Sequence, residues 1–197
     1  MPRPKRISDE AVLEAALRVM LRAGPEDFTL RAVSREAGVA PATLLQRFGD
    51  KRSLIVRALA RDNSGFAELV RRAPPGPGRE AVLDLFRLMT PEGDDLEQLA
   101  TGLLWLREDF RDPALNALAR ERFGVLRAAI AERLPPLPLP AAACAALLEA
   151  QWQGAINQWG FFREGTLAEH VAASLNAWFD LAEAGAGRPG APPGAGP

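Results

Sequence analysis

The chain has 197 residues, of which 48% are hydrophobic and 25% are charged, and its formal net charge is −1. This composition is enough to bury a core and excludes a wholly disordered chain. One cysteine, Cys144, excludes an internal disulfide, and one histidine, His170, argues against a multi-histidine metal site. Because we find neither a membrane-length apolar run nor the pattern of a secretory signal, we expect a cytoplasmic protein that needs no cofactor.

The charge is unevenly distributed along the chain. Residues 1–61 contain 12 Lys and Arg against 7 Asp and Glu, a net charge of +5, and the remainder contains 12 bases and 18 acids, a net charge of −6. This asymmetry suggests that only the first third of the chain meets a polyanion such as nucleic acid. Chance clustering in an arginine-rich chain is the alternative.

The first predicted helix begins after Ser8, a residue suited to the N-cap position, and ends at Gly24-Pro25. Its apolar residues recur at helical spacing and define one buried face: Val12, Ala16, Val19, Met20 and Ala23.

Two short helices should follow, separated by a tight turn. Thr29 is suited to cap a helix over residues 30–37, and Gly38 should end it because glycine adopts positive φ readily. Pro41 stands where the next helix would begin, and Gly49 should end that helix.

The rest of the chain also reads as helical, and no segment alternates long enough to predict a strand. Asp50 should cap a helix over residues 51–72, and proline-rich breaks fall at 73–78 and 135–140. We expect the remaining helices at about 79–90, 94–110, 113–134 and 141–164, with a last one from Thr166. Residues 185–197 consist of Gly, Ala, Pro and Arg, and we expect them to be disordered.

Residues 29–51 have the plan of a helix-turn-helix, in which the second helix enters the major groove of DNA. If the apolar residues of this segment pack inward, four side chains of the second helix point outward: Ala42, Thr43, Gln46 and Arg47. These types suit base recognition, since arginine pairs with guanine, glutamine with adenine, and the Ala and Thr methyl groups contact thymine.

Residues 12–18 (VLEAALR) and 28–54 (FTLRAVSREAGVAPATLLQRFGDKRSL) strongly resemble the N-terminal domain of the TetR family of bacterial transcriptional regulators. The resemblance implies an all-α fold of about nine helices. A three-helix DNA-binding domain would cover residues 1–53, the helix over 51–72 would link the domains, and residues 54–184 would bind a small molecule and form a homodimer.

The resemblance also implies a function and contact residues. The protein would be a repressor that leaves a palindromic DNA operator when an apolar small-molecule effector binds. Thr29 and Arg31 would contact the DNA backbone or a base edge, and Lys51 would meet a phosphate at the start of its helix.

Three positions depart from the usual family pattern. Leu45 stands where a phosphate-contacting tyrosine is common, which leaves Leu45 to pack against the domain instead. Arg47 replaces a frequent histidine, and Ala40 replaces a frequent serine, so a side-chain cap is missing there. These departures bear on sequence preference and leave the motif intact.

Sequence spacing suggests two further sets of residues in the C-terminal part. We expect an apolar ligand cavity to be lined by Phe86, Met89, Leu103, Trp105, Leu106, Phe110, Phe123, Trp152, Ile156 and Trp159. We expect the dimer to be anchored by Leu148, Leu175, Trp178 and Phe179. Gln151, Gln153, Asn157 and Gln158 could line the cavity, cross the dimer interface or face water.

The sequence gives less support to other classes of function. No phosphate loop, nucleophile elbow or metal motif supports an enzyme, and the adjacent acids Glu108 and Asp109 should point apart on a helix and either be solvated or act as caps. A protein–protein adaptor or a small-molecule-binding protein without a DNA role is the main alternative, and it would lack salt-dependent DNA binding. The basic residues Arg3, Lys5 and Arg6 either reach DNA or form a solvated end.

Overall fold

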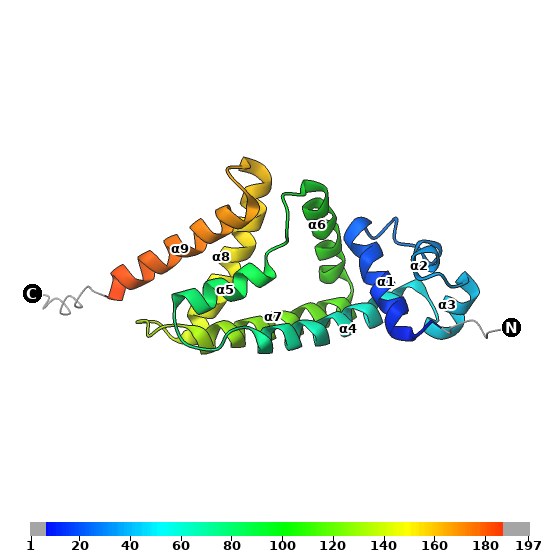
Figure 1. Cartoon of the computed structure of the whole chain (residues 1–197), viewed down its shortest axis with the longest axis horizontal. Helices are drawn as coiled ribbons and strands as arrows, with labels where there is room; N and C mark the ends of the chain where they lie inside the picture. Colours follow the sequence, from blue (N-terminus) through cyan, green and yellow to red (C-terminus); the bar gives the residue numbers. More distant parts are fainter. Residues whose placement is uncertain (1–6, 187–197) are drawn as a thin grey trace, which may run out of the picture. The chain divides into compact units, whose positions relative to one another are not determined.

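The structure is a computed structural model that describes residues 7–186 (Figure 1). Within that range it contains nine α-helices and no strand, as the sequence predicted. The helices are α1 (Asp9–Arg22), α2 (Leu30–Ala37), α3 (Pro41–Phe48), α4 (Lys51–Arg72), α5 (Arg79–Met89), α6 (Leu96–Arg111), α7 (Pro113–Arg133), α8 (Ala141–Phe162) and α9 (Leu167–Ala186).

Side-chain caps account for where several helices begin. The hydroxyl of Ser8 accepts a hydrogen bond from Ala11 N (3.2 Å), that of Thr29 from Ala32 N (3.1 Å), and the carboxylate of Asp50 from Ser53 N (2.7 Å). These are three of the caps expected from the sequence, and each satisfies a backbone donor that a helix leaves unpaired. Ala40, at the start of α3, makes no such bond, as its side chain predicts.

The ends of the chain differ in part from expectation. Helix α9 continues to Ala186, so residues 185 and 186, expected to be disordered, are helical. The rest of that predicted tail, together with Arg3, Lys5 and Arg6, lies outside the described residues.

The chain divides into two compact units. The first consists of residues up to Leu69 and of Asp95–Phe123, and the second consists of Val70–Asp94 and the residues from Gly124 onward. This division does not coincide with the expected boundary after residue 53, because α6 and the first part of α7 pack with the predicted DNA-binding helices.

One apolar core holds the first unit together. It is formed mainly by α1, α2, α3 and α4, and Leu115 of α7 joins it. Its fully buried members include Val12, Phe28, Val33, Leu44 and Leu54.

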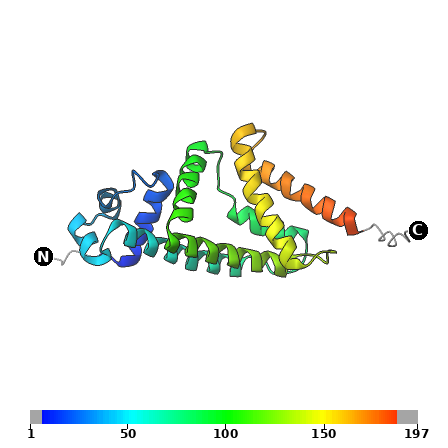
Figure 2. The same cartoon turned by 180° about the vertical axis from the view of Figure 1, so that it is seen from behind.

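In the second unit, α8 and α9 lie side by side in both views, and α5 packs on α9 (Figures 1 and 2). Phe86, Leu148, Leu175 and Phe179 are buried in this packing. A capping box connects Thr166 and Glu169 at the start of α9, with Thr166 N donating to the carboxylate (2.9 Å) and Glu169 N donating to the hydroxyl (3.2 Å).

A buried arginine closes one end of the second unit. The guanidinium of Arg133 donates to the carbonyl oxygens of Val70 (3.4 Å), Ala73 (3.4 Å), Pro74 (3.3 Å) and Ala129 (3.0 Å). Its charge therefore lies among the carbonyls at the end of α4 and in α7, where the partial negative charge of a helix C-terminus is favourable to a cation.

Across residues 7–186, no helix has both the length and the apolar character needed to cross a membrane. The same residues contain no cluster of three or more His, Cys, Asp and Glu side chains suited to a metal ion.

Replacement of Arg133 by alanine should lower the free energy of unfolding by about 3 kcal/mol, because buried carbonyl groups lose a charged donor. Urea unfolding followed by circular dichroism would measure this change. Arg120→Ala, at an exposed position of α7, is the matched control and should change stability by less than about 0.5 kcal/mol. Equal stabilities of the two variants would contradict this role for Arg133.

Candidate nucleic-acid interface

The turn between α2 and α3 is fixed by backbone geometry and one buried hydroxyl. Gly38 has φ 67° and ψ 33°, and its N–H donates to the carbonyl of Ser34. The Ser34 hydroxyl donates to Val39 O, and Val39 N donates back to Ser34 O (3.1 Å). Because left-handed backbone conformation is strained for residues with a Cβ atom, glycine suits this turn. The two helices therefore form a helix-turn-helix.

The outer face of α3 is mostly uncharged. Leu44 and Phe48 are buried in the core, Thr43 is half-buried, and the side chains of Ala42 and Gln46 are exposed. Leu45 is 49% exposed, so it does not take the packed position that the sequence left open to it. The face that α3 offers to a partner therefore combines apolar groups with one amide.

Arg47, expected to point outward, is instead held within the domain. Its Nε donates to Asp9 Oδ1 (2.7 Å), its Nη1 donates to Ile7 O (3.0 Å), and its guanidinium lies 5.5 Å from the Phe48 ring centroid. Arg57 reaches the same carboxylate (3.2 Å) and lies 4.5 Å from the same ring. The pKa of Asp9 is lowered, mainly by the hydrogen bond from Arg47.

Lys51 also has a partner inside the first unit. Its Nζ donates to Pro25 O (2.6 Å) and lies 5.9 Å from the centroid of the Phe28 ring. Lys51 thus fixes the loop that leads into Thr29, whose side chain is exposed while it caps α2.

Most of the basic residues between positions 18 and 61 are paired with nearby acids. Glu36 pairs with Arg18 (2.7 Å) and Arg22 (2.5 Å), Arg61 pairs with Glu14, and Arg52 pairs with Asp112 (2.5 Å). The pKa of Asp112 is lowered to about 2, mainly by the hydrogen bond from Arg52.

Two arginines of α2 remain without a partner. Within the described part of the chain, Arg31 and Arg35 are exposed and make neither a hydrogen bond nor an ion pair. Their i, i+4 spacing places them on one face of α2. Arg35 is absent from the set expected from sequence, although this spacing from Arg31 would have indicated it.

Helix α6 is anchored to α1 within the first unit. The indole N–H of Trp105, expected to line a ligand cavity, donates to the carbonyls of Met20 (3.1 Å) and Ala23 (3.0 Å), and its ring packs edge-on against Phe28 at 5.7 Å. Trp105 therefore caps the last turn of α1. Further along α6, burial raises the pKa of Asp109 to about 6, so Asp109 is not the fully solvated acid that was expected.

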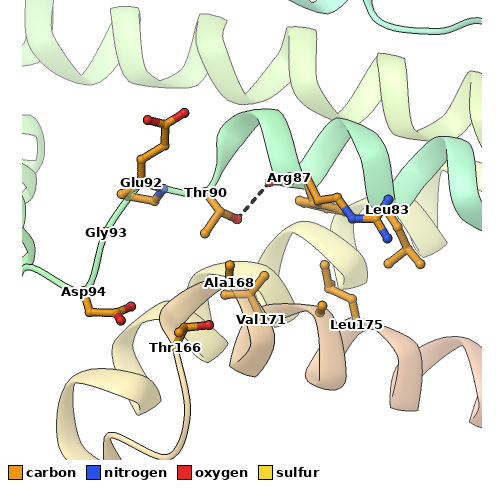
Figure 3. Close-up of a pocket in the computed structure, with 13 residues that line it drawn as sticks. Leu83, Arg87, Thr90, Glu92, Gly93, Asp94, Thr166, Ala168, Val171 and Leu175 are labelled. Atoms are coloured by element: carbon orange, nitrogen blue, oxygen red, sulfur yellow. Dashed lines mark hydrogen bonds between the residues drawn. The ribbon is translucent and has the colours of Figure 1, made fainter.

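The second unit contains a cavity of about 360 Å³ between α5, the loop after it and α9 (Figure 3). Its floor is apolar and includes Leu83, Phe86, Val171 and Leu175. Its other lining residues are Arg87, Thr90, Pro91, Glu92, Gly93, Asp94, Thr166, Ala168 and Ala172.

Hydrogen bonds hold the polar end of this cavity in place. Thr90 Oγ1 donates to Phe86 O (2.8 Å) and accepts from the indole of Trp152 (3.1 Å). The carboxylate of Asp94 accepts from Leu167 N (2.8 Å) at the start of α9. Glu92 makes no such bond in the part of the chain described, and its carboxylate is exposed.

Comparison with known families identifies the N-terminal region. Residues 12–58 match the family described as bacterial regulatory proteins, tetR family. This N-terminal domain belongs to the TetR family. The matched segment runs from α1 into α4 and includes the whole helix-turn-helix, so the chain carries a TetR-like DNA-binding domain.

Solved structures extend the TetR-like fold beyond that segment. A transcriptional regulator from Rhodococcus has a TM-score of 0.76 at 19% identity, covering 93% of this chain and 100% of that one. A regulator from Saccharomonospora viridis in complex with choline has 0.70 at 19%, covering 87% and 95%. The multidrug binding protein EbrR, complexed with malachite green, has 0.63 at 25%, covering 88% and 98%. A comparison with curated protein sequences found no match.

The residues expected to line one ligand cavity are split between the two units of this TetR-like regulator. Phe86 lines the cavity, and Trp152 lies behind it with its ring 5.7 Å from that of Phe86. Trp159 is buried and donates to Gly165 O (3.1 Å), while Met89 and Ile156 are half-buried in the same unit. Leu103, Trp105, Leu106, Phe110 and Phe123 belong to the first unit, and Phe110 is 74% exposed.

Three of the four expected dimer anchors of the TetR-like regulator are buried inside the chain. Leu148, Leu175 and Phe179 are in the core of the second unit, and half-buried Trp178 packs edge-on against Phe179 at 5.2 Å. These helices instead expose the apolar side chains Leu147, Phe161, Phe162 and Leu181.

The polar residues of α8 have several roles. Gln151 donates to the Ser174 hydroxyl on α9 (2.7 Å), and Gln153 donates to buried Glu149 (2.6 Å). Asn157 and Gln158 are exposed.

Proposed function

We propose that this TetR-like regulator is a repressor that binds a palindromic operator as a homodimer and releases it when a small molecule binds. The observation that supports its contact with DNA is the exposed outer face of α3 next to two unpaired arginines of α2. A helix of this kind enters the major groove, and free cations beside it suit the phosphate backbone.

The proposed contacts follow from exposure and chemistry. Ala42, Thr43 and Gln46 would meet base edges, and Thr29 would contact the backbone. Arg31 and Arg35 would bind phosphates. Arg47 and Lys51, which have partners within the domain, would hold the reading surface in place.

We propose that the effector occupies the cavity between α5 and α9. A volume of about 360 Å³, an apolar floor and a few polar groups fit a small organic ligand. Glu92 and Asp94 at one end favour a ligand with a positive charge, because the one cation of the lining, Arg87, is paired with Asp84 and Glu80. The proposal is supported by the similar structures that hold choline and malachite green, both of which are organic cations.

The exposed apolar residues of α8 and α9 would form the homodimer interface. None of the exposed residues of α8 is charged, a composition that suits an interface core. Leu147, Phe161 and Phe162 of α8 and Leu181 of α9 would replace the buried anchors expected from sequence.

Repression and release follow from linked equilibria. Two DNA-binding domains fit a palindrome when their recognition helices are about 34 Å apart, one turn of DNA. A ligand that binds better to dimers with another spacing lowers operator affinity, because it shifts the population toward those dimers. The alternative of an adaptor without a DNA role predicts that no duplex binds with the salt dependence of phosphate contacts.

Selection of bound duplexes from a random pool should yield a palindromic sequence. Arg31→Ala and Arg35→Ala should each weaken binding and reduce the slope of log affinity against log salt by about 1, because each removes one phosphate contact. The control Arg120→Ala should leave affinity and slope unchanged. Wild-type affinity and slope in both α2 variants would contradict the proposed DNA face.

Because the proposed cavity takes organic cations, choline and malachite green should raise the melting temperature of the wild-type protein. A ligand that raises the melting temperature should also weaken operator binding. Glu92→Gln should weaken binding of that ligand about threefold, since an exposed charge pair contributes roughly 0.2–1 kcal/mol. Glu132→Gln, another exposed acid of the second unit, is the control. A ligand that stabilises the protein and leaves operator affinity unchanged would argue against its role as effector.

Phe161→Glu should dissociate the dimer. Burial of a phenylalanine contributes roughly 2 kcal/mol, so the two copies in one dimer correspond to about a thousandfold change in dissociation constant. Analytical ultracentrifugation would measure it, with Phe110→Glu in the first unit as the control for an exposed phenylalanine. A dimer that persists in Phe161→Glu and dissociates in Phe110→Glu would place the interface elsewhere.

A further inference from the structure

We propose that α3 reads A·T base pairs, through methyl contacts of Leu45 and Ala42 and an amide contact of Gln46, while Arg47 is kept off the bases. This inference rests on the proposed function, because it names the class of DNA sequence that the same surface recognises.

One side chain of α3 is of the type that recognises guanine. Arg47 is the one basic residue in α3, and arginine pairs with guanine through O6 and N7. Its guanidinium is bound to the Asp9 carboxylate and to Ile7 O, and its side chain is 17% exposed. A bidentate contact with guanine would require Arg47 to leave these partners. The geometry therefore removes the guanine-reading group from the outer face of α3.

Leu45 presents an apolar side chain on the outer face of α3. A leucine that is 49% exposed in the middle of a recognition helix has no packing role to account for it. Ala42 lies three residues before it and is also exposed, so the two side chains share one face of the helix. The major groove offers one apolar group for such a surface, the C5-methyl of thymine. Burying that methyl against Leu45 and Ala42 favours thymine over cytosine.

Gln46 presents a polar amide on the outer face of α3. Its side chain is exposed and makes no hydrogen bond to other described residues. A glutamine amide matches adenine, where it can donate to N7 and accept from the N6 amino group. Helix α3 contains no Asp or Glu that could accept from the amino group of cytosine. The free groups of α3 thus favour thymine and adenine, and half-buried Thr43 is the one that can serve any base.

The experiment begins with the palindrome selected by the wild-type protein. Each thymine of the half-site is replaced in turn by deoxyuridine, which lacks only the C5-methyl group. We expect affinity to fall about fourfold at one thymine or more, the factor that corresponds to burying one methyl group. Each guanine is replaced by 7-deazaguanine, which lacks the N7 acceptor, and we expect no loss within the base pairs that face α3.

The variant Leu45→Ala assigns the effect to one side chain. It should bind thymine and deoxyuridine duplexes about equally at the sensitive position. Leu21→Ala, at an exposed leucine of α1, should keep the wild-type difference. Because Leu45 is exposed, its replacement should leave the fold intact, and circular dichroism would check this.

Each outcome has a distinct meaning. If wild-type protein retains no duplex even at low salt, the proposed function fails, and this inference fails with it. If a palindrome binds but contains G·C pairs facing α3 whose 7-deazaguanine analogues weaken binding, the A·T assignment is overturned while the DNA-binding function stands. If Leu45→Ala stays as sensitive to deoxyuridine as the wild type, Leu45 does not read the methyl group.

Discussion

The proposed DNA-facing surface depends on the Asp9 carboxylate, which accepts hydrogen bonds from two arginines at once. Arg47 comes from α3 and Arg57 from α4, and both guanidinium groups lie against the Phe48 ring. One acid at the start of α1 therefore connects three helices. Because this connection removes Arg47 from the outer face of α3, it also decides which side chains the proposed DNA face presents.

The same pairing changes the electrostatic argument for nucleic-acid binding. The first 61 residues have a net charge of +5, but the arginines of α1 and α3 and the three arginines of α4 within this range have acidic partners. Such pairs have small fields at a distance because opposite charges lie a few ångströms apart. In the described chain, the arginines of the motif that have no partner are Arg31 and Arg35 of α2, which a count along the sequence does not reveal.

Local signals in the sequence predicted the helices well, and long-range packing explains where prediction from sequence failed. Caps at Ser8 and Thr29 and the glycine at position 38 act within a few residues, so a single sequence is enough to find them. Helical spacing groups Leu148 with Trp152, but it does not say which partner helix covers them. The expected cavity therefore mixed residues of two units, and the expected dimer anchors included Leu175 and Phe179, which the chain already buries. The hydrogen bonds from the Trp105 indole join residues more than 80 positions apart, and no local pattern encodes them.

Trp105 also has a practical consequence for spectroscopy. The chain contains four tryptophans, and Trp105 is the one that belongs to the first unit, while Trp152, Trp159 and Trp178 belong to the second. Its indole is fixed by two carbonyl groups beside a buried phenylalanine, so its fluorescence emission reports on the end of α1. Each unit therefore carries intrinsic fluorophores of its own, and variants that keep tryptophan in one unit alone would report on the unfolding of that unit without an attached dye.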